Sequence, residues 1–323
     1  MAEGRSRKTF EVLHSGAMAS IQDLGRIGYQ KYGVPISGAM DKFSLRVANL
    51  LAGNSEGDAA LEITVVGPRL RALRAMKVGL AGGDLSPRIN GQPCSMWRSY
   101  GLKEGDLLSF GPVRSGCRAY VAISGGIFVP KVMGSCSTHV RLGLGGLGRA
   151  IEAGDIIHAG IGRSGENLCP HRVLPERLIP IYTRDWLIRF IPGPQSAYFT
   201  SRGLRTFMTG EYVVTPQSDR MASRLKGPKI EHRRGADVIS DATPPGSIQI
   251  PGDGMPILFH ADGQATGGYA KIGVAVTPDQ DRLAQSKPGD TIRFQRADLE
   301  EARRLWGEAQ DRMREARASL QKI

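Results

Sequence analysis

The residues best suited to chemistry lie in one segment of thirteen residues, HADGQATGGYAKI, at His260–Ile272. The segment follows the apolar run Ile257–Phe259, a pattern typical of a strand that enters a polar loop. Its side chains donate and accept hydrogen bonds and carry positive charge, as the binding of an anionic or carbonyl substrate requires. Lys271 could orient a carboxylate or a phosphate, and Tyr269 and Gln264 could polarise a carbonyl. A hydrophilic hairpin without chemistry is the alternative interpretation.

Two glycine-rich stretches resemble nucleotide-binding loops only superficially. Gly25–Gly33, GRIGYQKYG, has neither the order GxxxxGK[ST] of a phosphate loop nor the spacing G-x-G-x-x-G of a dinucleotide fingerprint. Leu142–Gly148, LGLGGLG, is not followed by a helical pattern, and Asp155 comes too early for the ribose contact expected about 20 residues further on. We interpret the second stretch as a mobile glycine loop, of the kind that can gate an active site.

The histidines and cysteines do not predict a metal site. The six histidines show no HxH or HxxxH pairing, so no zinc site built from neighbouring ligands is expected. The four cysteines are well separated and form no CxxC pair or catalytic-cysteine signature. A serine hydrolase is also disfavoured, because the sequence has no GxSxG elbow around Ser37 or Ser124.

The net charge of +12 invites a nucleic-acid interpretation, which the distribution of the charge disfavours. Lysine and arginine are spread along the chain without a run of five or six, and no zinc finger or RNP motif accompanies them. A solvated basic surface or a site for an anionic small molecule is favoured instead. The N-terminus is polar and no apolar run approaches twenty residues, so we expect a cytoplasmic protein that does not enter a membrane.

Short apolar runs bounded by Gly, Pro or Asp predict a mostly β protein made of barrels or sandwiches. Two short helices are predicted at Asp41–Leu51 and Asp219–Lys226, each beginning with an aspartate that can cap it. Their first seven residues, DKFSLRV and DRMASRL, are similar in residue class. Together with similar landmarks downstream, this similarity indicates a tandem duplication.

The duplication and the composition predict three regions. A first β-barrel domain is expected at residues 8–165 and a second at 181–297, joined by the proline-rich stretch Gly165–Pro180. From Asp298 onward apolar residues keep a helical spacing, and Asp298 with Glu301 resembles a capping box. Residues 298–323 are therefore predicted to form an amphipathic helix that packs on the body or on a partner.

Ordered motifs along the chain resemble one family, the biotin-dependent carboxyltransferases, also called allophanate hydrolase subunit 2. The family includes the C subunit of bacterial 5-oxoprolinase, the Kip-type antagonist of a sporulation kinase inhibitor, and half of the carboxyltransferase domain of urea carboxylase. The resemblance extends from about Phe10 to Phe294. Its motifs lie at Ser20–Arg26, Gly33–Asp41, Ala48-Asn49, Gly53-Asn54, Ala60–Thr64, Gly67-Pro68, Ser218–Met221 and Thr266–Ile272.

The resemblance implies two cyclophilin-like β-barrel domains and a B-subunit partner, the homologue of allophanate hydrolase subunit 1 or of the Kip inhibitor, with an A-subunit protein as a further partner. It also implies a small amide substrate. The leading interpretation is the C subunit of an ATP-dependent 5-oxoprolinase-type lactam hydrolase, with ATP used in the complex. A chain of this length without a fused biotin domain favours it. The alternatives are a carboxyltransferase subunit of a urea-type carboxylase, which takes carboxybiotin from a partner, and a non-enzymatic regulator that binds a kinase-inhibitor protein.

Eight residues are candidates for the site. Arg26, Arg220 and Lys271 are expected to bind anionic groups, and Tyr269 and Gln264 to polarise a carbonyl. The long polar loop Ser20–Asp41 is expected to deliver Asp23 and Arg26 to an interface. Asp41 and Asp219 are expected to cap helices and to orient the basic residues beside them. The catalytic candidates are Gln264, Tyr269 and Lys271, and the substrate-binding candidates are Asp23, Arg26, Asp41, Asp219 and Arg220.

Overall fold

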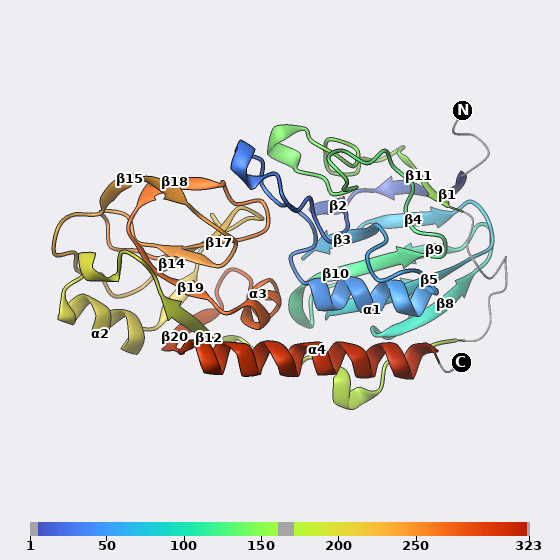
Figure 1. The fold of residues 1–323 in the computed structure, drawn as a ribbon. Helices are drawn as coiled ribbons and strands as arrows, with labels where there is room; N and C mark the ends of the chain where they lie inside the picture. Colours follow the sequence, from blue (N-terminus) through green and yellow to red (C-terminus); the bar gives the residue numbers. More distant parts are fainter. Residues whose placement is uncertain (1–5, 161–170, 322–323) are drawn as a thin grey trace. The chain divides into compact units, whose positions relative to one another are not determined.

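A computed structural model describes residues 6–160 and 171–321. The regular elements of these residues are mostly β-strands, together with four α-helices (Figure 1). The described residues divide into two compact units. Unit 1 comprises the chain up to Arg26, then Ser37–Tyr182, and the end of the chain from Arg312 onward. Unit 2 comprises Ile27–Ile36 and Thr183–Asp311. The prediction of a mostly β protein is confirmed.

Unit 1 contains two antiparallel sheets. The six-stranded sheet has the order β11 (Ile156–Gly160), β1 (Ser6–His14), β4 (Arg69–Ala72), β9 (Leu107–Ser109), β6 (Arg88–Ile89) and β7 (Gln92–Pro93). The five-stranded sheet has the order β2 (Met18–Gln22), β3 (Ala60–Thr64), β10 (Ser115–Ile123), β5 (Met76–Asp84) and β8 (Arg98–Leu102).

The five-stranded sheet is buried on both faces. Alternate residues of a strand point to opposite sides of the sheet, so neighbouring residues belong to different clusters. In β10, Ala119 and Val121 belong to one hydrophobic cluster with residues of the six-stranded sheet. Tyr120 and Ala122, which alternate with these two residues along β10, belong to a second cluster with residues of the helix α1 (Lys42–Ala52). Helix α1 lies along this second face of the sheet (Figure 1).

Helix α1 begins and ends where local chemistry requires. The Asp41 carboxylate accepts a hydrogen bond from the Ser44 backbone N at 2.9 Å, and Gly53 ends the helix with a φ of 86°. The helix approaches β5 so closely that a Cβ on Gly79 would lie 2.1 Å from the Ala48 carbonyl oxygen. Glycine is therefore required at this crossing.

Unit 2 is built around a closed barrel of seven strands. Its order is β12 (Asp185–Pro192), β19 (Lys271–Ala275), β16 (Ser247–Gln249), β17 (Ile257–Phe259), β14 (Ala222–Lys226), β13 (Tyr212–Val214) and β20 (Thr291–Arg296). The ring closes through the parallel pair β12 and β20. A separate two-stranded sheet pairs β15 (Asp237–Ala242) with β18 (Thr266–Tyr269).

Helices α2 (Ser201–Thr209) and α3 (Thr277–Leu283) belong to unit 2, together with an aromatic cluster. Phe207 of α2 stacks on Phe294 of β20 with ring centroids 4.3 Å apart. Short 3₁₀ helices occur at Gln30–Tyr32, Val140–Leu142, Glu176–Leu178 and Ser196–Tyr198.

The predicted C-terminal helix is confirmed as α4 (Leu299–Gln321). The Asp298 carboxylate accepts a hydrogen bond from the Glu301 backbone N at 2.8 Å, as a helix cap does. Leu305 packs in a cluster with residues of unit 2, whereas Met313 and Leu320 are buried in the core of unit 1.

The prediction of a helix at Asp219–Lys226 is wrong, since Ala222–Lys226 is strand β14, paired with β13 and β17. Residues Ser223 and Leu225 are buried while Arg224 and Lys226 are exposed. This alternation has the period of a strand, and the two neighbouring strands override the helix propensity of the individual residues. The similar seven-residue segments that begin at Asp41 and Asp219 therefore do not form the same element. They no longer support a tandem duplication.

Candidate functional site

The catalytic candidates all lie in unit 2, close to the pair of strands β16 and β19 and to the sheet of β15 and β18. Three of the substrate-binding candidates lie in unit 1 instead. The candidates of unit 2 are Asp219, Arg220, Gln264, Tyr269 and Lys271, and those of unit 1 are Asp23, Arg26 and Asp41.

Lys271, the first residue of β19, holds a buried ammonium group. Its Nζ donates hydrogen bonds to Oδ2 of Asp241 at 2.6 Å and to the carbonyl oxygen of Ala242 at 2.8 Å. The Lys271 side chain is 4% exposed, whereas that of Asp241 is 47% exposed. The hydrogen bond from Lys271 lowers the pKa of the Asp241 carboxyl, with a smaller contribution from the Ala242 backbone. A buried charge needs such a partner to stay ionised.

Gln195, which the sequence analysis did not identify, ties Lys271 and Asp241 together. Its Nε2 donates to Oδ2 of Asp241 and its Oε1 accepts from the Lys271 backbone N, both at 3.3 Å. Gln195 precedes a short 3₁₀ helix after β12 and lies 76 positions from Lys271. No local pattern of residue types signals this contact.

The side-chain amides of Gln249 and Gln264 both lie close to Gly267 of β18. Gln249 of β16 is buried and is the register partner of Lys271 in β19. A Cβ on Gly267 would lie 2.6 Å from Nε2 of Gln249 and 3.1 Å from Nε2 of Gln264. Within the described residues, Nε2 of Gln249 has no hydrogen-bond partner. Glycine at 267 therefore leaves room for both amides, which can donate to a ligand oxygen.

Tyr269 is placed differently from Lys271 although only Ala270 separates them. Tyr269 ends β18, pairs with Asp237 of β15 and is 41% exposed. Throughout residues 6–160 and 171–321, no hydrogen bond joins its hydroxyl to Lys271. An exposed phenol of this kind can still reach a bound molecule, so its catalytic role stays a prediction.

Arg220 is held in a buried ion pair with Asp262. Its Nε and Nη2 donate to the two carboxylate oxygens of Asp262 at 2.8 and 3.1 Å, in the bidentate geometry of the strongest arginine–carboxylate pairs. His260 lies nearby in sequence, with Nε2 2.7 Å from Oγ of Ser223. The guanidinium of Arg220 is thus already matched to a carboxylate of the protein.

Asp219 does not cap a helix, because the element that follows it is strand β14. Its Oδ1 accepts hydrogen bonds from the backbone N of Met221 and of Ala222, at 2.7 and 3.1 Å. These bonds form a turn that leads into β14. The prediction of a helix cap at Asp219 is therefore wrong.

In unit 1, the Asp23 carboxylate is hydrogen-bonded to the segment 135–137. It accepts hydrogen bonds from Oγ of Ser135 at 2.6 Å, from Oγ of Ser137 at 2.5 Å and from the backbone N of Cys136 at 2.6 Å. A fourth bond comes from the Gly25 backbone N at 2.8 Å. Four donors satisfy most of the acceptor capacity of one carboxylate.

Arg26 lies beneath the glycine-rich stretch Leu142–Gly148. The side chain is buried and its Nη2 donates to the Ser137 carbonyl oxygen. A Cβ on Gly145 would lie 2.5 Å from the same nitrogen, and one on Gly146 would lie 1.9 Å from Oγ1 of Thr138. The glycines are therefore needed for close packing over Arg26. Asp41 caps α1 as predicted.

The arrangement in unit 2 can bind an anion and polarise a carbonyl group. The ammonium of Lys271 and the amide of Gln249 are buried donors, and electrostatic interactions are stronger in such surroundings than in water. The amide of Gln264 is a further donor at an exposed position. In the described parts of the chain, no group of three potential ligands is placed to hold a metal ion. No described helix is long and apolar enough to span a membrane.

Comparisons with known proteins agree with the motifs along the chain. The model of a family described as "Carboxyltransferase domain, subdomain A and B" matches residues 32–296. The 5-oxoprolinase C subunit of Haemophilus influenzae is 32% identical over 296 residues, which are 91% of this chain and 93% of that protein. The 5-oxoprolinase C subunit of Escherichia coli is 34% identical and covers 90% of this chain and 92% of its own length.

A solved structure shows the same fold within a larger enzyme. The crystal structure of the K. lactis urea amidolyase matches 96% of this chain with a TM-score of 0.89 and 32% identity. The chain spans only 20% of that much longer protein. The similarity therefore extends to a part of the urea amidolyase and to nearly all of the two 5-oxoprolinase proteins.

Proposed function

Because the chain belongs to the family of the carboxyltransferase domain, subdomain A and B, we propose that it is the C subunit of a 5-oxoprolinase-type amide hydrolase. In this proposal it acts with a homologue of the B subunit, and with the A subunit as a further partner. One observation carries the choice: the match spans 93% of the H. influenzae protein. Nearly every part of that protein thus has a counterpart in this chain.

The site in unit 2 suits a lactam that carries a carboxylate, as 5-oxoproline does. In the proposal the Lys271 ammonium, held by Asp241, binds the carboxylate of the substrate. The amides of Gln249 and Gln264 donate to the lactam oxygen and stabilise the negative charge that develops there. Hydrolysis then breaks the ring carbon–nitrogen bond, the oxygen of water joins the carbon, and the ring nitrogen leaves as an amine. Tyr269 is proposed as a further donor at the edge of the site.

The ATP of the proposed reaction would supply the energy for opening the lactam. The glycine-rich stretch Leu142–Gly148 does not fit its phosphates, because Gly145 and Gly146 are packed against Arg26 and Thr138. The stretch Gly25–Gly33 does not have the residue order of a phosphate loop. We therefore assign nucleotide binding to a partner protein of the complex.

The second candidate function is a carboxyltransferase subunit of a urea-type carboxylase. The TM-score of 0.89 with the K. lactis urea amidolyase favours it. The Lys271 ammonium and the two amides also suit the carboxylate of carboxybiotin, which a partner would carry. A regulator that binds a kinase-inhibitor protein is the remaining, non-enzymatic alternative.

Co-expression with homologues of the A and B subunits, followed by an assay of glutamate release from 5-oxoproline, tests the proposal. We expect ATP-dependent release by the complex and none when any component is omitted. Carboxylation of urea with a biotinylated partner, without glutamate release, would establish the second function instead. A complex that catalyses neither reaction but binds a kinase-inhibitor protein would support the regulatory alternative.

A further inference from the structure

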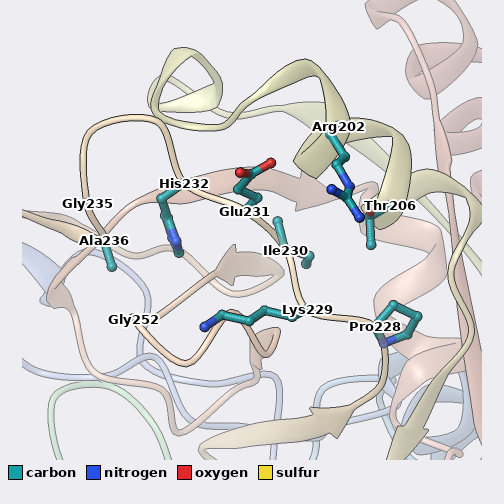
Figure 2. Close-up of a pocket in the computed structure, with 10 residues that line it drawn as sticks. All are labelled: Arg202, Thr206, Pro228, Lys229, Ile230, Glu231, His232, Gly235, Ala236 and Gly252. Atoms are coloured by element: carbon teal, nitrogen blue, oxygen red, sulfur yellow. The ribbon is translucent and has the colours of Figure 1, made fainter.

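Unit 2 contains a cleft of about 720 Å³ that none of the candidate site residues lines (Figure 2). Helix α2 contributes Arg202 and Thr206, and the connection between β14 and β15 contributes Pro228–His232 with Gly235 and Ala236. Gly252, which follows β16, also lines the cleft. A cleft of this volume is in the range that holds small organic ligands.

Two cations of the cleft have no counter-ion among the residues that the structure describes. Within residues 6–160 and 171–321, neither Arg202 nor Lys229 forms an ion pair or a side-chain hydrogen bond. Among the described residues that line the cleft, Glu231 has the single carboxylate, which accepts from Oγ1 of Thr200 at 2.8 Å. Figure 2 shows that this carboxylate and the Lys229 ammonium extend in different directions.

The side chain of Lys229 is positioned by packing. A Cβ on Gly254 would lie 2.6 Å from Cγ of Lys229, and Gly254 has a φ of 78°. Glycine at this position therefore lets the lysine stem lie flat against the backbone. An ordered stem reduces the conformational entropy that binding a ligand would cost.

His232 is also held in one orientation. Its ring lies 5.0 Å from the ring of Phe199, and Nε2 is 2.9 Å from the carbonyl oxygen of Ile250. A carbonyl oxygen can only accept, so Nε2 carries a proton and donates it. Nδ1 is then the ring's second polar atom.

We propose that this cleft binds a small anion with at least two carboxylate or phosphate groups. Arg202 offers a planar fork for one anionic group, and Lys229 offers a point charge for a second. The exposed residues Arg233 and Arg234 follow the lining residue His232 in the chain and add positive charge, which attracts anions from solution. The apolar walls at Pro228 and Ile230 suit a carbon skeleton.

The cleft is hydrogen-bonded to Ala270, the residue that joins strand β18 to strand β19. Ala236, which lines it, accepts a hydrogen bond from the backbone N of Ala270 at 2.8 Å. Ala270 lies between Tyr269 and Lys271, and its carbonyl oxygen accepts from the Ile250 backbone N at 3.1 Å. The cleft is lined by none of the residues proposed for amide hydrolysis. A test of anion binding in the cleft is therefore independent of a test of the proposed amide hydrolase.

Isothermal titration calorimetry of the full chain with sodium pyrophosphate and, in a separate arm, with sodium citrate tests the proposal at constant ionic strength. We expect saturable binding of one molecule per chain in at least one arm, and the arm identifies phosphate or carboxylate chemistry. Arg202→Gln and Lys229→Gln should each weaken binding about tenfold, because each removes a charged hydrogen-bond donor. The controls Arg205→Gln and Lys226→Gln remove exposed charges that do not line the cleft, and should change the affinity less than twofold.

A steric variant separates shape from charge. No atom lies within 4 Å of a Cβ built on Gly252, so Gly252→Phe should fold normally and occupy part of the cleft that this residue lines. We expect it to abolish binding while the thermal unfolding midpoint and the net charge stay unchanged. Absence of saturable binding in both arms would overturn the proposal. An equal loss of affinity in the control variants, or undiminished binding by Gly252→Phe, would likewise overturn it, since the anions would then bind the basic surface at large.

Discussion

At the scale of single residues, Lys271 combines burial with a specific partner. Transferring an ammonium from water into a protein costs several kcal/mol unless a counter-charge and hydrogen bonds compensate. Asp241 and the Ala242 carbonyl provide both, and Gln195 holds the aspartate in place. Such an arrangement keeps a cation ready for an anionic group without reorganisation.

Replacing Lys271 by methionine keeps the volume of the side chain and removes the charge. In the assembled complex we expect kcat/KM for 5-oxoproline to fall by a factor of about 100 to 1,000, the usual loss on removing one stabilising donor. Lys226→Met, on an exposed position of β14, is the matched control and should keep its activity. Assembly with the B-subunit homologue should not change, and the thermal unfolding midpoint should fall only slightly, because Asp241 is 47% exposed. A variant that no longer folds or assembles would show that Lys271 is structural.

The same variant provides a test by titration. The pKa of the folded Asp241 carboxyl lies below the ordinary value of 3.8, mainly because of the hydrogen bond from Lys271. A carboxyl with a lowered folded pKa contributes stability above its unfolded pKa, and that contribution is lost as the pH falls through the folded pKa. The Lys271–Asp241 pair should therefore persist across neutral pH and break only in acid. Carboxyl ¹³C NMR should show the pKa of Asp241 rising toward 3.8 in Lys271→Met, and an unchanged pKa would contradict the pairing.

At the scale of elements, strand register and helix caps place the side chains. Gln249 reaches the neighbourhood of Lys271 because β16 and β19 pair in a register that sets these two residues opposite each other. In unit 1, the cap at Asp41 starts α1, and α1 covers a full face of the five-stranded sheet. The loss of such a cap weakens the element at its first turn.

We expect Asp41→Ala to loosen the start of α1, with a cost of about 1 kcal/mol for the lost cap. This cost corresponds to roughly fivefold faster opening, measured by hydrogen exchange of the amides in the first turn. An asparagine caps a helix nearly as well as an aspartate, so Asp41→Asn should exchange at the original rate and keep its activity in the complex. Loss of activity in Asp41→Asn at an unchanged exchange rate would instead show that the charge of Asp41 serves the substrate.

At the scale of the whole molecule, each compact unit has a hydrophobic core of its own. Leu320 of α4 is fully buried in unit 1, and Phe207 of α2 is fully buried in unit 2 against Phe294. Chains with more than one core often do not unfold in a single two-state transition. The two units are therefore expected to respond differently to changes in their cores.

Differential scanning calorimetry of the full chain tests this expectation. Leu320→Ala and Phe207→Ala each create a cavity that costs about 2–5 kcal/mol. We expect each variant to lower a different component of the unfolding trace, whereas Leu299→Ala, at an exposed position, should change neither. If both cavity variants lower one sharp transition by the same amount, the two units unfold as one cooperative structure.

The sequence by itself determined the features that depend on neighbouring residues. The strands bounded by glycine and proline, the cap at Asp41, the helix after Asp298 and the family resemblance all follow from local patterns. The same local argument was wrong for Asp219–Lys226, where pairing with two strands outweighed helix propensity.

Only the tertiary structure decided which distant residues meet. Gln195 and Asp241 join Lys271 across 76 and 30 positions of sequence, and the cleft at Arg202 and Lys229 forms between separate elements. Periodicity and capping report the environment within a turn or a strand, but they do not record which strands pair or in what register. Burial and hydrogen bonding decided which candidate charges are matched within the protein, as for Asp23 and Arg220. The tertiary structure also placed Lys229, which the sequence did not single out, at a cleft where it has no counter-ion among the described residues.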